Sequence, residues 1–395
     1  MNTTMKKNQQ MIRKNPANTA HTGTMEKITR EIFNVSYTNA FFILLFFIIT
    51  SGCKKNDKET PATSPAGEQS AIDMRIPHSR DFEPVNLVAD TAGYHAIRID
   101  ANLSNAWGLA FSDEGDIWIS SNHTGLALIY NGSGQQIDPP VNVPFGGDPN
   151  GGAPTGAVYN ETNSFIIPSN NEKAEFIYAT ENGTIAAWSS GNSTITVADR
   201  SSSEAVYKGL ALAENAGANY IYATNFKGNA IDVFDGSFNY VSMPFMDPGI
   251  PAGFAPFGIQ NIDGKLYVTY ALQKGPDNED DQSGPGNGYI DIYNPDGTFV
   301  SRFASQGTLN SPWGLAQVPG GNHAILVGNF GDGHINVYGS MGNFLGQLKD
   351  DGHDIEIEGL WAIAFKRGNF GKLKLYFTAG PDEEEHGLFG FIIKE

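Results

Sequence analysis

The sequence is poor in the residues on which disulfide frameworks, zinc motifs and nucleic-acid surfaces depend. Its 395 residues include one cysteine, Cys53. No internal disulfide can form, and zinc motifs that need two to four thiolates are excluded. Positive charge is also scarce, because 25 Lys and Arg stand against 43 Asp and Glu, a net charge of −18. Such an acidic chain repels phosphate backbones, so nucleic acid is not expected as a partner.

Charged residues make up only 17% of the chain, whereas glycine, proline and aromatic residues are plentiful. There are 46 Gly and 21 Pro, and 11% of the residues are aromatic. Many short strands joined by tight turns have this composition, and long helices do not. We therefore expect an all-β fold.

An apolar run long enough to cross a bilayer is also missing near the N-terminus. Residues 41–49, FFILLFFII, are nine apolar residues and would rise about 13.5 Å as a helix, against a hydrocarbon core of roughly 30 Å. Basic residues precede this run and Ser51-Gly52-Cys53 follows it, which is the order of a secretory signal peptide. The Ser-Gly-Cys ending resembles the bacterial lipoprotein signal, and this resemblance implies that Cys53 is acylated.

The charge divides the chain into parts with different roles. Residues 1–58 hold nine Lys and Arg against three Asp and Glu, which leaves the other 337 residues at a net charge of −24. We predict a leader and lipoprotein signal peptide over residues 1–52, with Met25 as an alternative start. An acylated cysteine and flexible tether follow over 53–83, and a globular domain covers 84–395. The protein is then expected in the cell envelope, anchored by lipid to a bacterial outer membrane on its periplasmic or surface side.

The globular part contains six repeats. One short apolar block that ends in an aromatic or apolar residue recurs at intervals of 45 to 59 residues, at 125–130, 183–188, 229–234, 288–293, 333–338 and 387–392. Two further apolar runs precede each block, and each repeat leaves room for a fourth strand. Six such repeats predict a six-bladed β-propeller.

Two details of the repeats support a closed ring. A strand candidate at 84–88 precedes the first repeat, and the last repeat ends after its third strand. We therefore expect residues 84–88 to complete the last blade, because an open ring would leave two unpaired edges. Glycines in the innermost strands, at Gly108, Gly209, Gly258 and Gly314, indicate that six strands crowd around a narrow channel.

A family resemblance covers roughly residues 85–395. It rests on strings such as NAWGLAFS (105–112), PAGFAPFGIQNIDGKLYVTYA (251–271), GPGNGYIDIYNPDG (284–297), GNFGDGHINVY (328–338) and YFTAGPDEEEHGLFG (376–390). The chain resembles a bacterial family of exported, uncharacterised six-bladed propellers related to NHL-repeat proteins. The resemblance implies this fold and export, and it implies no particular reaction.

Loops between the second and third strands are expected to gather on one face and to carry function. Oxygen donors on these loops suit a hard cation such as Ca²⁺. The candidate metal ligands are Glu181, Asn225, Asp280, Asp281, Asn329, Asp332 and Asp382. Two other interpretations stay open, namely solvated acidic loops without a ligand and a zinc site made by His123, His334 and His386.

A wider binding face is predicted around the central channel. Its candidate residues are Trp107, Asn122, His123, Asn182, Phe257, Trp313 and Trp361. We expect a propeller that binds a small molecule, a glycan or a protein partner. The alternative is a calcium-dependent hydrolase or lyase of lactonase type at the channel. Three or more Asn, Asp and Glu side chains that converge on one point would favour the enzyme.

Overall fold

The computed structural model describes residues 82–320, 323–367 and 373–394. Cys53, the predicted leader (1–52) and the predicted tether up to residue 81 lie outside the described residues. Within the described ranges almost all regular structure is β, apart from the short 3-10 helix η1 (Ser201–Ser203). No helix in these ranges is long and apolar enough to span a bilayer.

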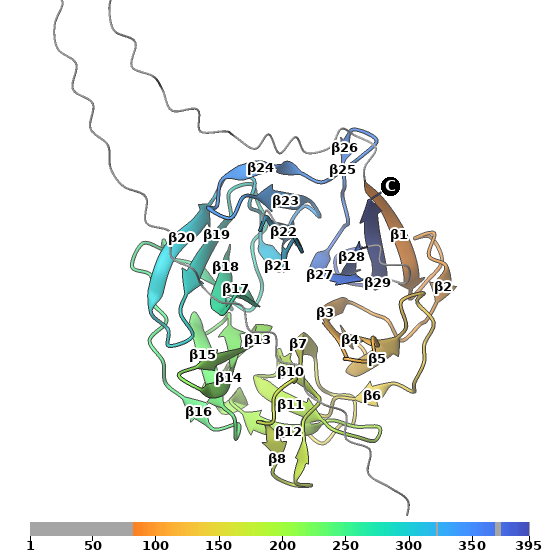
Figure 1. Cartoon of the computed structure of the whole chain (residues 1–395). Coiled ribbons are helices and arrows are strands. Elements are labelled where there is room, and N and C mark those ends of the chain that lie inside the picture. The colour runs from red at the N-terminus through yellow and green to blue at the C-terminus, as the bar shows by residue number, and fades with distance from the viewer. Residues whose placement is uncertain (1–81, 321–322, 368–372, 395) are drawn as a thin grey trace, which may run out of the picture. The chain divides into compact units, whose positions relative to one another are not determined.

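Six four-stranded units surround a central axis, as Figure 1 shows, and this confirms the predicted propeller. The first two blades are β3 (Ala106–Phe111), β4 (Ile117–Ser121), β5 (Leu126–Tyr130), β6 (Val141–Asn142), and β7 (Pro154–Tyr159), β10 (Phe176–Thr180), β11 (Thr184–Trp188), β12 (Ile195–Asp199). The third and fourth blades are β13 (Tyr207–Asn215), β14 (Ala218–Asn225), β15 (Ala230–Asp235), β16 (Tyr240–Val241), and β17 (Phe254–Ile262), β18 (Lys265–Leu272), β19 (Gly288–Tyr293), β20 (Phe299–Ser305). The last two are β21 (Pro312–Gln317), β22 (Ile325–Asn329), β23 (Ile335–Tyr338), β24 (Phe344–Gln347), and β27 (Leu360–Arg367), β28 (Leu373–Ala379), β29 (Leu388–Lys394), β1 (Phe82–Ala89).

The ring closes as predicted. Strand β1 pairs antiparallel with β29, from Phe82 opposite Lys394 to Ala89 opposite Leu388. The short strand β2 (Arg98–Ile99) adds to the outer side of β1 in parallel. Two small hairpins decorate the blades: β8 (Ile166–Ile167) with β9 (Glu172–Lys173), and β25 (Lys349–Asp350) with β26 (His353–Asp354). The chain that closes the ring therefore comes from both ends of the propeller sequence.

Each blade packs on the next through apolar side chains. Among the described residues, six clusters of buried apolar residues lie between neighbouring blades, and a seventh lies on the central axis. Alternation along a strand explains the pattern, because successive side chains point to opposite faces of a blade and each face meets a neighbour. This packing holds the six innermost strands close together.

Every innermost strand carries a β-bulge at the same place. Two of its residues stand opposite one residue of the second strand. The bulged pairs are Trp107-Gly108, Thr155-Gly156, Lys208-Gly209, Phe257-Gly258, Trp313-Gly314 and Trp361-Ala362. Crowding explains the glycines, because a Cβ at Gly258 would lie 2.1 Å from the Trp313 carbonyl oxygen of the next blade.

Hydroxyl groups of the second strands bridge neighbouring blades at these bulges. Thr224 accepts a hydrogen bond from the Gly209 amide at 2.6 Å and donates one to the Phe257 carbonyl of the next blade at 2.7 Å. The Thr378 hydroxyl joins the Ala362 amide to the Trp107 carbonyl in the same way. These bridges fix the height of the bulged pairs that they join along the axis.

Candidate functional site

The first residues of the six bulged pairs meet on the axis and form an aromatic plug. Trp107 and Trp361 stack with ring centroids 3.4 Å apart, and Trp313 stands edge-on to both. Phe257 and Phe330 pack against Trp361. Trp107, Phe257, Trp313 and Trp361, all predicted for the binding face, therefore form a buried structure inside the channel.

One blade breaks the aromatic pattern with a lysine. Lys208 occupies the plug position of the third blade, and only 3% of its side chain is exposed. Its ammonium lies 2.5 Å from the Glu181 carboxylate, 3.6 Å from Asp280 and 5.2 Å from the centre of the Trp107 ring. Burial alone lowers the pKa of Lys208, but Glu181, Asp280 and Glu384 raise it by more, so the pKa is raised overall. The ammonium stays charged at neutral pH.

Glu181 is the main partner of this lysine. Its second carboxylate oxygen accepts a hydrogen bond from Asn122 at 2.9 Å. Burial would raise the pKa of Glu181, yet the Lys208 charge and the hydrogen bonds from Lys208 and Asn122 lower it further than burial raises it. Glu181 is therefore ionised, and 28% of its side chain faces solvent.

Glu384 approaches the same point from the last blade. Its carboxylate accepts a 2.6 Å hydrogen bond from Asn105, whose own side-chain oxygen accepts one from the Trp361 indole at 3.0 Å. Burial raises the pKa of Glu384 to about 7, and Glu181 and Asp280 add to the rise, whereas Lys208 and Asn105 oppose it. We call Lys208, Glu181, Asp280 and Glu384, with their amide partners Asn105 and Asn122, the mouth cluster.

The backbone that carries Glu384 is strained. Asp382, Glu383 and Glu384 all have left-handed φ values, of 58°, 53° and 70°. Each such non-glycine residue costs on the order of 1 kcal/mol, and strain of this kind persists where the surroundings determine the conformation. Here the loop between β28 and β29 directs one carboxylate toward the axis while its neighbours stay exposed.

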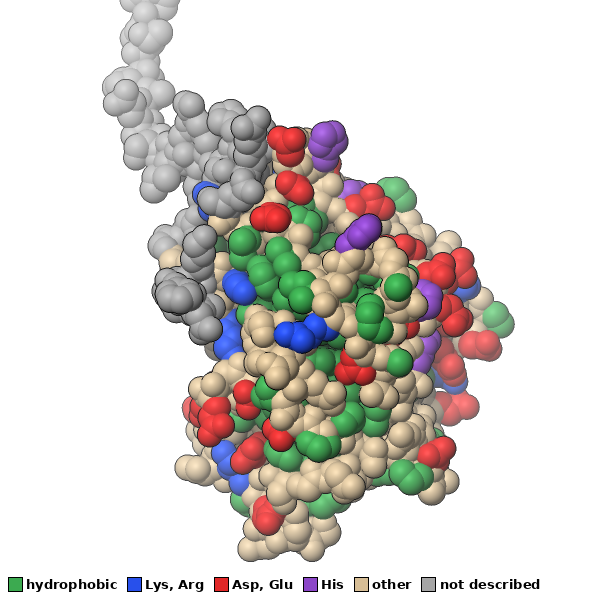
Figure 2. All heavy atoms as spheres, turned by 90° about the vertical axis from the view of Figure 1, so that its right-hand side faces the viewer, with side chains coloured by type: hydrophobic (Ala, Val, Ile, Leu, Met, Phe, Trp, Pro, Cys, Tyr) green, Lys and Arg blue, Asp and Glu red, His purple; other side chains and the backbone are tan. Residues whose placement is uncertain are grey.

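Loops that bear acidic residues lie at this end of the channel. In the side view of Figure 2, which faces the first and last blades, Asp, Glu and His side chains concentrate along one edge of the molecule. Five of the six blades contribute to the mouth cluster. The contributing blades are the first (Asn105, Asn122), second (Glu181), third (Lys208), fourth (Asp280) and sixth (Glu384).

The structure therefore brings together part of the predicted site. Glu181, Asp280 and Asn122 belong to the mouth cluster, and His123 lies beside it, with its Nε2 atom 3.3 Å from the Asn105 amide nitrogen. Glu181, Asp280 and Glu384 all act on Lys208, which is the convergence expected of an enzyme site. The ion at its centre is the protein's own ammonium group.

Two predicted asparagines serve their own loops instead. The side-chain oxygen of Asn225 accepts hydrogen bonds from the backbone amides of Val206 and Gly228, at 3.2 and 3.0 Å. Asn182 accepts one from the Ala153 amide at 2.7 Å. These side chains stabilise turns, which is the common role of Asn in such places.

The remaining metal candidates are also dispersed. Asn329 donates a hydrogen bond to Asp332 at 3.0 Å within one loop of the fifth blade. Asp281 accepts a hydrogen bond from Ser311, and burial raises its pKa. The Asp382 side chain is 73% exposed beside His386. No group of three or more His, Cys, Asp or Glu side chains in the described ranges could hold a metal ion. The structure therefore does not bring all the predicted calcium ligands together, because Asn225, Asn329 and Asp332 bond locally, and calcium binding stays a prediction.

The three-histidine zinc interpretation fails for a similar reason. His386 pairs with Asp90 at 2.9 Å, and His334 pairs with Asp332 at 3.3 Å. His123 lies beside Asn105 in the first blade. Each imidazole has a partner of its own blade or of an adjoining strand, so the three do not converge.

Sequence reasoning missed Lys208, Asn105 and the inward direction of Glu384. A signal for Lys208 was present, because alignment of the six bulged pairs puts one lysine among Trp, Phe and Thr. Glu384 gave no such signal, since it stands in an acidic run whose other members point to solvent. Its direction follows from three left-handed residues that no sequence pattern announces.

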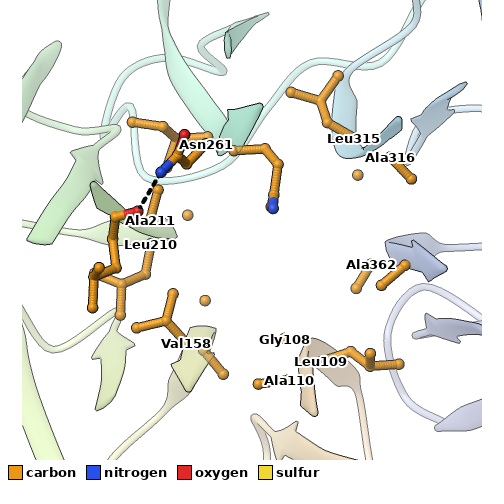
Figure 3. A pocket seen from close by; sticks show the side chains of 18 of the residues that line it. Gly108, Leu109, Ala110, Val158, Leu210, Ala211, Asn261, Leu315, Ala316 and Ala362 are labelled. Atoms are coloured by element: carbon orange, nitrogen blue, oxygen red, sulfur yellow. Dashed lines mark hydrogen bonds between the residues drawn. The ribbon is translucent and has the colours of Figure 1, made fainter. Parts of the chain in front are cut away.

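Beyond the plug, the channel is open at the end opposite the mouth cluster. The open part has a volume of about 650 Å³ and is walled by the second halves of all six innermost strands. Figure 3 shows Gly108, Val158, Leu210, Ala316 and Ala362 around this space. The central channel therefore has a charged, side-chain-filled mouth on one face and an open cavity on the other, whose wall combines apolar side chains with about as much polar surface.

Comparisons with known proteins give the chain its relatives. No protein-family model matches it. Uncharacterized proteins L690 and R648 of Acanthamoeba polyphaga mimivirus are each 31% identical to this chain over 328 residues. The match covers 79% of this chain, 86% of L690 and 80% of R648. These relatives are viral, so the bacterial origin in the predicted resemblance is not supported, and the link to NHL-repeat proteins stays a prediction.

One solved structure is similar in fold. A Bacteroides thetaiotaomicron protein of unknown function covers 79% of this chain and 76% of its own, with a TM-score of 0.52 and 9% identity. At this identity the likeness concerns the fold alone. The sequence similarity to the mimivirus proteins extends over most of both chains. The chain therefore belongs to the same protein family as L690 and R648 of mimivirus.

Proposed function

We propose that the protein is a ligand-binding propeller that recognises a small polar molecule at the mouth cluster. Convergence on one point also suits an enzyme, so the observation that carries this proposal is that the point is the buried ammonium of Lys208, the protein's own cation. A buried ion pair contributes little net stability compared with apolar residues of similar size. Five other blades fill the same plug position with Trp, Phe or Thr, so packing alone does not explain a lysine.

The charges of the mouth cluster define the class of ligand. One ammonium stands among the carboxyl groups of Glu181, which is ionised, Glu384, which is partly ionised at neutral pH, and Asp280. The excess of negative charge disfavours carboxylates and phosphates. It suits neutral molecules with several hydroxyl groups and small amines, which donate hydrogen bonds to the exposed carboxylates Asp280 and Glu181.

A thermal-shift comparison tests this proposal. The soluble propeller is titrated with neutral polyols and sugars, with primary amines and with carboxylic acids. A compound bound only by the folded state raises the melting temperature, and saturation at 100 times Kd adds about 2.7 kcal/mol. We expect neutral polyols, sugars and primary amines to raise the melting temperature of the wild type. They should not raise that of Lys208→Met.

Lys265→Met is the matched control, because Lys265 is exposed and lies on the hairpin between β17 and β18. This variant should keep the wild-type shifts. Carboxylic acids that bind best, or shifts that survive in Lys208→Met, would contradict the proposal.

Acid–base catalysis is a second candidate function, favoured by the contrast between two carboxyl groups. The pKa of Glu384 is raised to about 7 while that of Glu181 is lowered. Such a split is typical of residues that exchange protons near neutral pH. With an ester or lactone, Glu384 would take a proton from water as its oxygen attacks the carbonyl carbon. Lys208 would stabilise the negative carbonyl oxygen until the C–O bond breaks, and Glu384 would then pass its proton to the leaving alcohol oxygen.

A panel of esters and lactones separates this candidate from a calcium-dependent hydrolase. We expect turnover that persists in EDTA and that Glu384→Gln abolishes, with Glu383→Gln, an exposed neighbour, as the control. Turnover that EDTA removes and calcium restores would instead support the metal-dependent reaction. Absence of turnover from the whole panel leaves ligand binding as the function.

The cellular site of this activity is proposed from the sequence. A signal peptide and an acylated Cys53 would place the propeller at the cell envelope, tethered to a membrane by residues 53–83. The ligand would then be a molecule met outside the cytoplasm.

A further inference from the structure

The open part of the central channel has the size and walls of a ligand cavity of its own. Its volume of about 650 Å³ falls within the roughly 300–1,000 Å³ usual for small-molecule sites. The plug separates it from the mouth cluster, since Trp313 and the bulge glycines line its closed end whereas Lys208 does not line it. A molecule in this cavity would therefore occupy a second site.

Apolar side chains line part of the wall of the cavity. Leu109, Val158 and Leu212 lie on innermost strands. Most residues of these strands are buried, whereas these three are only partly buried. Val158 faces the open space in Figure 3. Apolar surface left in contact with water inside a concave wall is a source of binding free energy for an apolar molecule, at about 25 cal/mol per Å².

The plug makes the closed end of the cavity. Trp313 is 8% exposed and lines the cavity. Its indole N–H is buried within the plug and has no surface that a molecule in the cavity could touch. Trp313 therefore closes the cavity and offers no hydrogen bond from its ring to a bound molecule.

The open end of the cavity is polar and acidic. Glu161, Asp263 and Gln317 stand at the rim, and Gln317 donates a hydrogen bond to Asp263 at 2.7 Å. Asp263 is 68% exposed. The rim carboxylates repel anionic head groups such as that of a fatty acid, so the favoured molecule carries no negative charge.

We propose that this cavity is a second binding site, which takes an uncharged molecule with an apolar body. Six strands from six blades form its wall, so the molecule contacts the whole ring. The site is independent of the mouth cluster and of the function proposed for that cluster.

Two uncharged fluorescent probes test the proposal on the folded propeller. Prodan carries a carbonyl acceptor, whereas N-phenyl-1-naphthylamine has an apolar body without a carbonyl. We expect each to bind with saturation at one molecule per chain, and laurate, an anion, to compete at least tenfold more weakly than a neutral long-chain alcohol. Val158→Trp should fill the cavity and weaken both probes at least tenfold.

Matched variants control for general effects of the substitutions. Val300→Trp makes the same change on the outer strand β20, where Val300 is 46% exposed, and should leave both affinities unchanged. Circular dichroism and melting curves confirm that each variant is folded, and Leu212→Phe replaces Val158→Trp if the latter is not.

Three outcomes overturn the proposal. Probe binding that does not saturate, or that a folded cavity-filling variant leaves unchanged, places the probes outside the cavity. Equal losses in Val158→Trp and Val300→Trp do the same.

Discussion

At the scale of single residues, the mouth cluster shows how a buried charge can be kept. Lys208 loses its water but gains one carboxylate at 2.5 Å, a second at 3.6 Å and an indole face. Removal of one partner from such a pair leaves an uncompensated charge. The cluster is therefore stable only as a unit, and any ligand must be accommodated without displacement of Glu181 from the ammonium.

Glu384 should make the stability of the propeller depend on pH. Its pKa rises from 4.5 to about 7 on folding, so between these pH values the folded state holds more protons than the unfolded chain. The free energy of unfolding then falls as pH rises through this window. We expect Glu384→Gln to remove this fall. The free energy of unfolding of the variant minus that of the wild type should be larger at pH 8 than at pH 5 by about 2 kcal/mol, a value reduced for the partial exposure of Glu384.

Urea unfolding of the two proteins at pH 5 and pH 8 measures this difference. The groups that face Glu384 are Asn105, Lys208, Glu181 and Asp280, and they are unchanged in the variant. Glu383→Gln removes one exposed carboxylate of the same loop and should show no such difference. A wild-type stability that is flat from pH 5 to pH 8 would contradict the raised pKa.

At this scale, the sequence did not predict the directions in which side chains point. Asn122, Asn182, Asn225 and Asn329 come near the ends of their second strands, and the repeats alone make them look alike. Counted from the residue opposite the bulge, however, Asn225 and Asn329 are one residue further along, Asn122 is two and Asn182 is three. Asn122 reaches Glu181, whereas Asn225 turns back to its own loop. The difference follows from this register, because successive side chains of a strand point to opposite faces.

At the scale of strands, the hydrogen bonds that hydroxyl groups make between blades are the feature hardest to predict from the sequence. Ser120, Thr224, Thr269 and Thr378 stand opposite the bulges of their blades, whereas the second and fifth blades have Ala179 and Gly328 there. In the second blade Thr155 compensates, because its hydroxyl reaches the Tyr207 carbonyl of the next blade at 2.9 Å. Only some repeats make this contact, because the Thr269 hydroxyl bonds within its own blade and the Ser120 hydroxyl has no partner among the described residues.

Thr224→Val should destabilise the ring. The substitution keeps the shape of the side chain but leaves the Gly209 amide and the Phe257 carbonyl without their hydroxyl partner. Unpaired buried groups cost about 1–3 kcal/mol, and we expect a loss of about 2 kcal/mol in urea unfolding. Thr298→Val, at an exposed turn, is the control and should change stability by less than about 0.5 kcal/mol. Equal small effects would show that the bridge contributes nothing.

The strands themselves were predictable, and the reason is physical. Each blade buries both faces of its inner strands, so apolar runs mark them, and Asn-Gly and Asp-Gly turns separate them. All six predicted third-strand blocks lie on β5, β11, β15, β19, β23 and β29. The bulges and the small hairpins β8–β9 and β25–β26 were not predicted, because two-residue strands and one-residue register shifts leave no periodic pattern.

At the scale of the molecule, closure depends on a strand from the far end of the sequence. Deletion of residues 82–89 removes β1 and leaves β29 with an unpaired edge. We expect the broad, low-temperature melting of an open ring in place of one cooperative transition, measured by calorimetry. Deletion of the outer strand β2 (Arg98–Ile99), which pairs only with β1, is the control. A sharp transition after loss of β1 would show that five complete blades and a three-stranded sixth are enough.

The propeller has two chemically different ends, and an anchor would decide which of them faces a membrane. The sequence predicts this anchor at Cys53, outside the described residues, with a tether over residues 53–83, of which the structure places the last two in β1. Two acyl chains bind a membrane stably, at about 0.8 kcal/mol per buried methylene, whereas one is marginal. Expression with the native leader in a bacterial host that processes lipoproteins should place the protein in the membrane fraction. Cys53→Ser should release it and Lys54→Ser, a neighbouring change, should not. Cys53→Ser protein that stays with the membrane would contradict lipidation and would point to retention by the uncleaved run at 41–49.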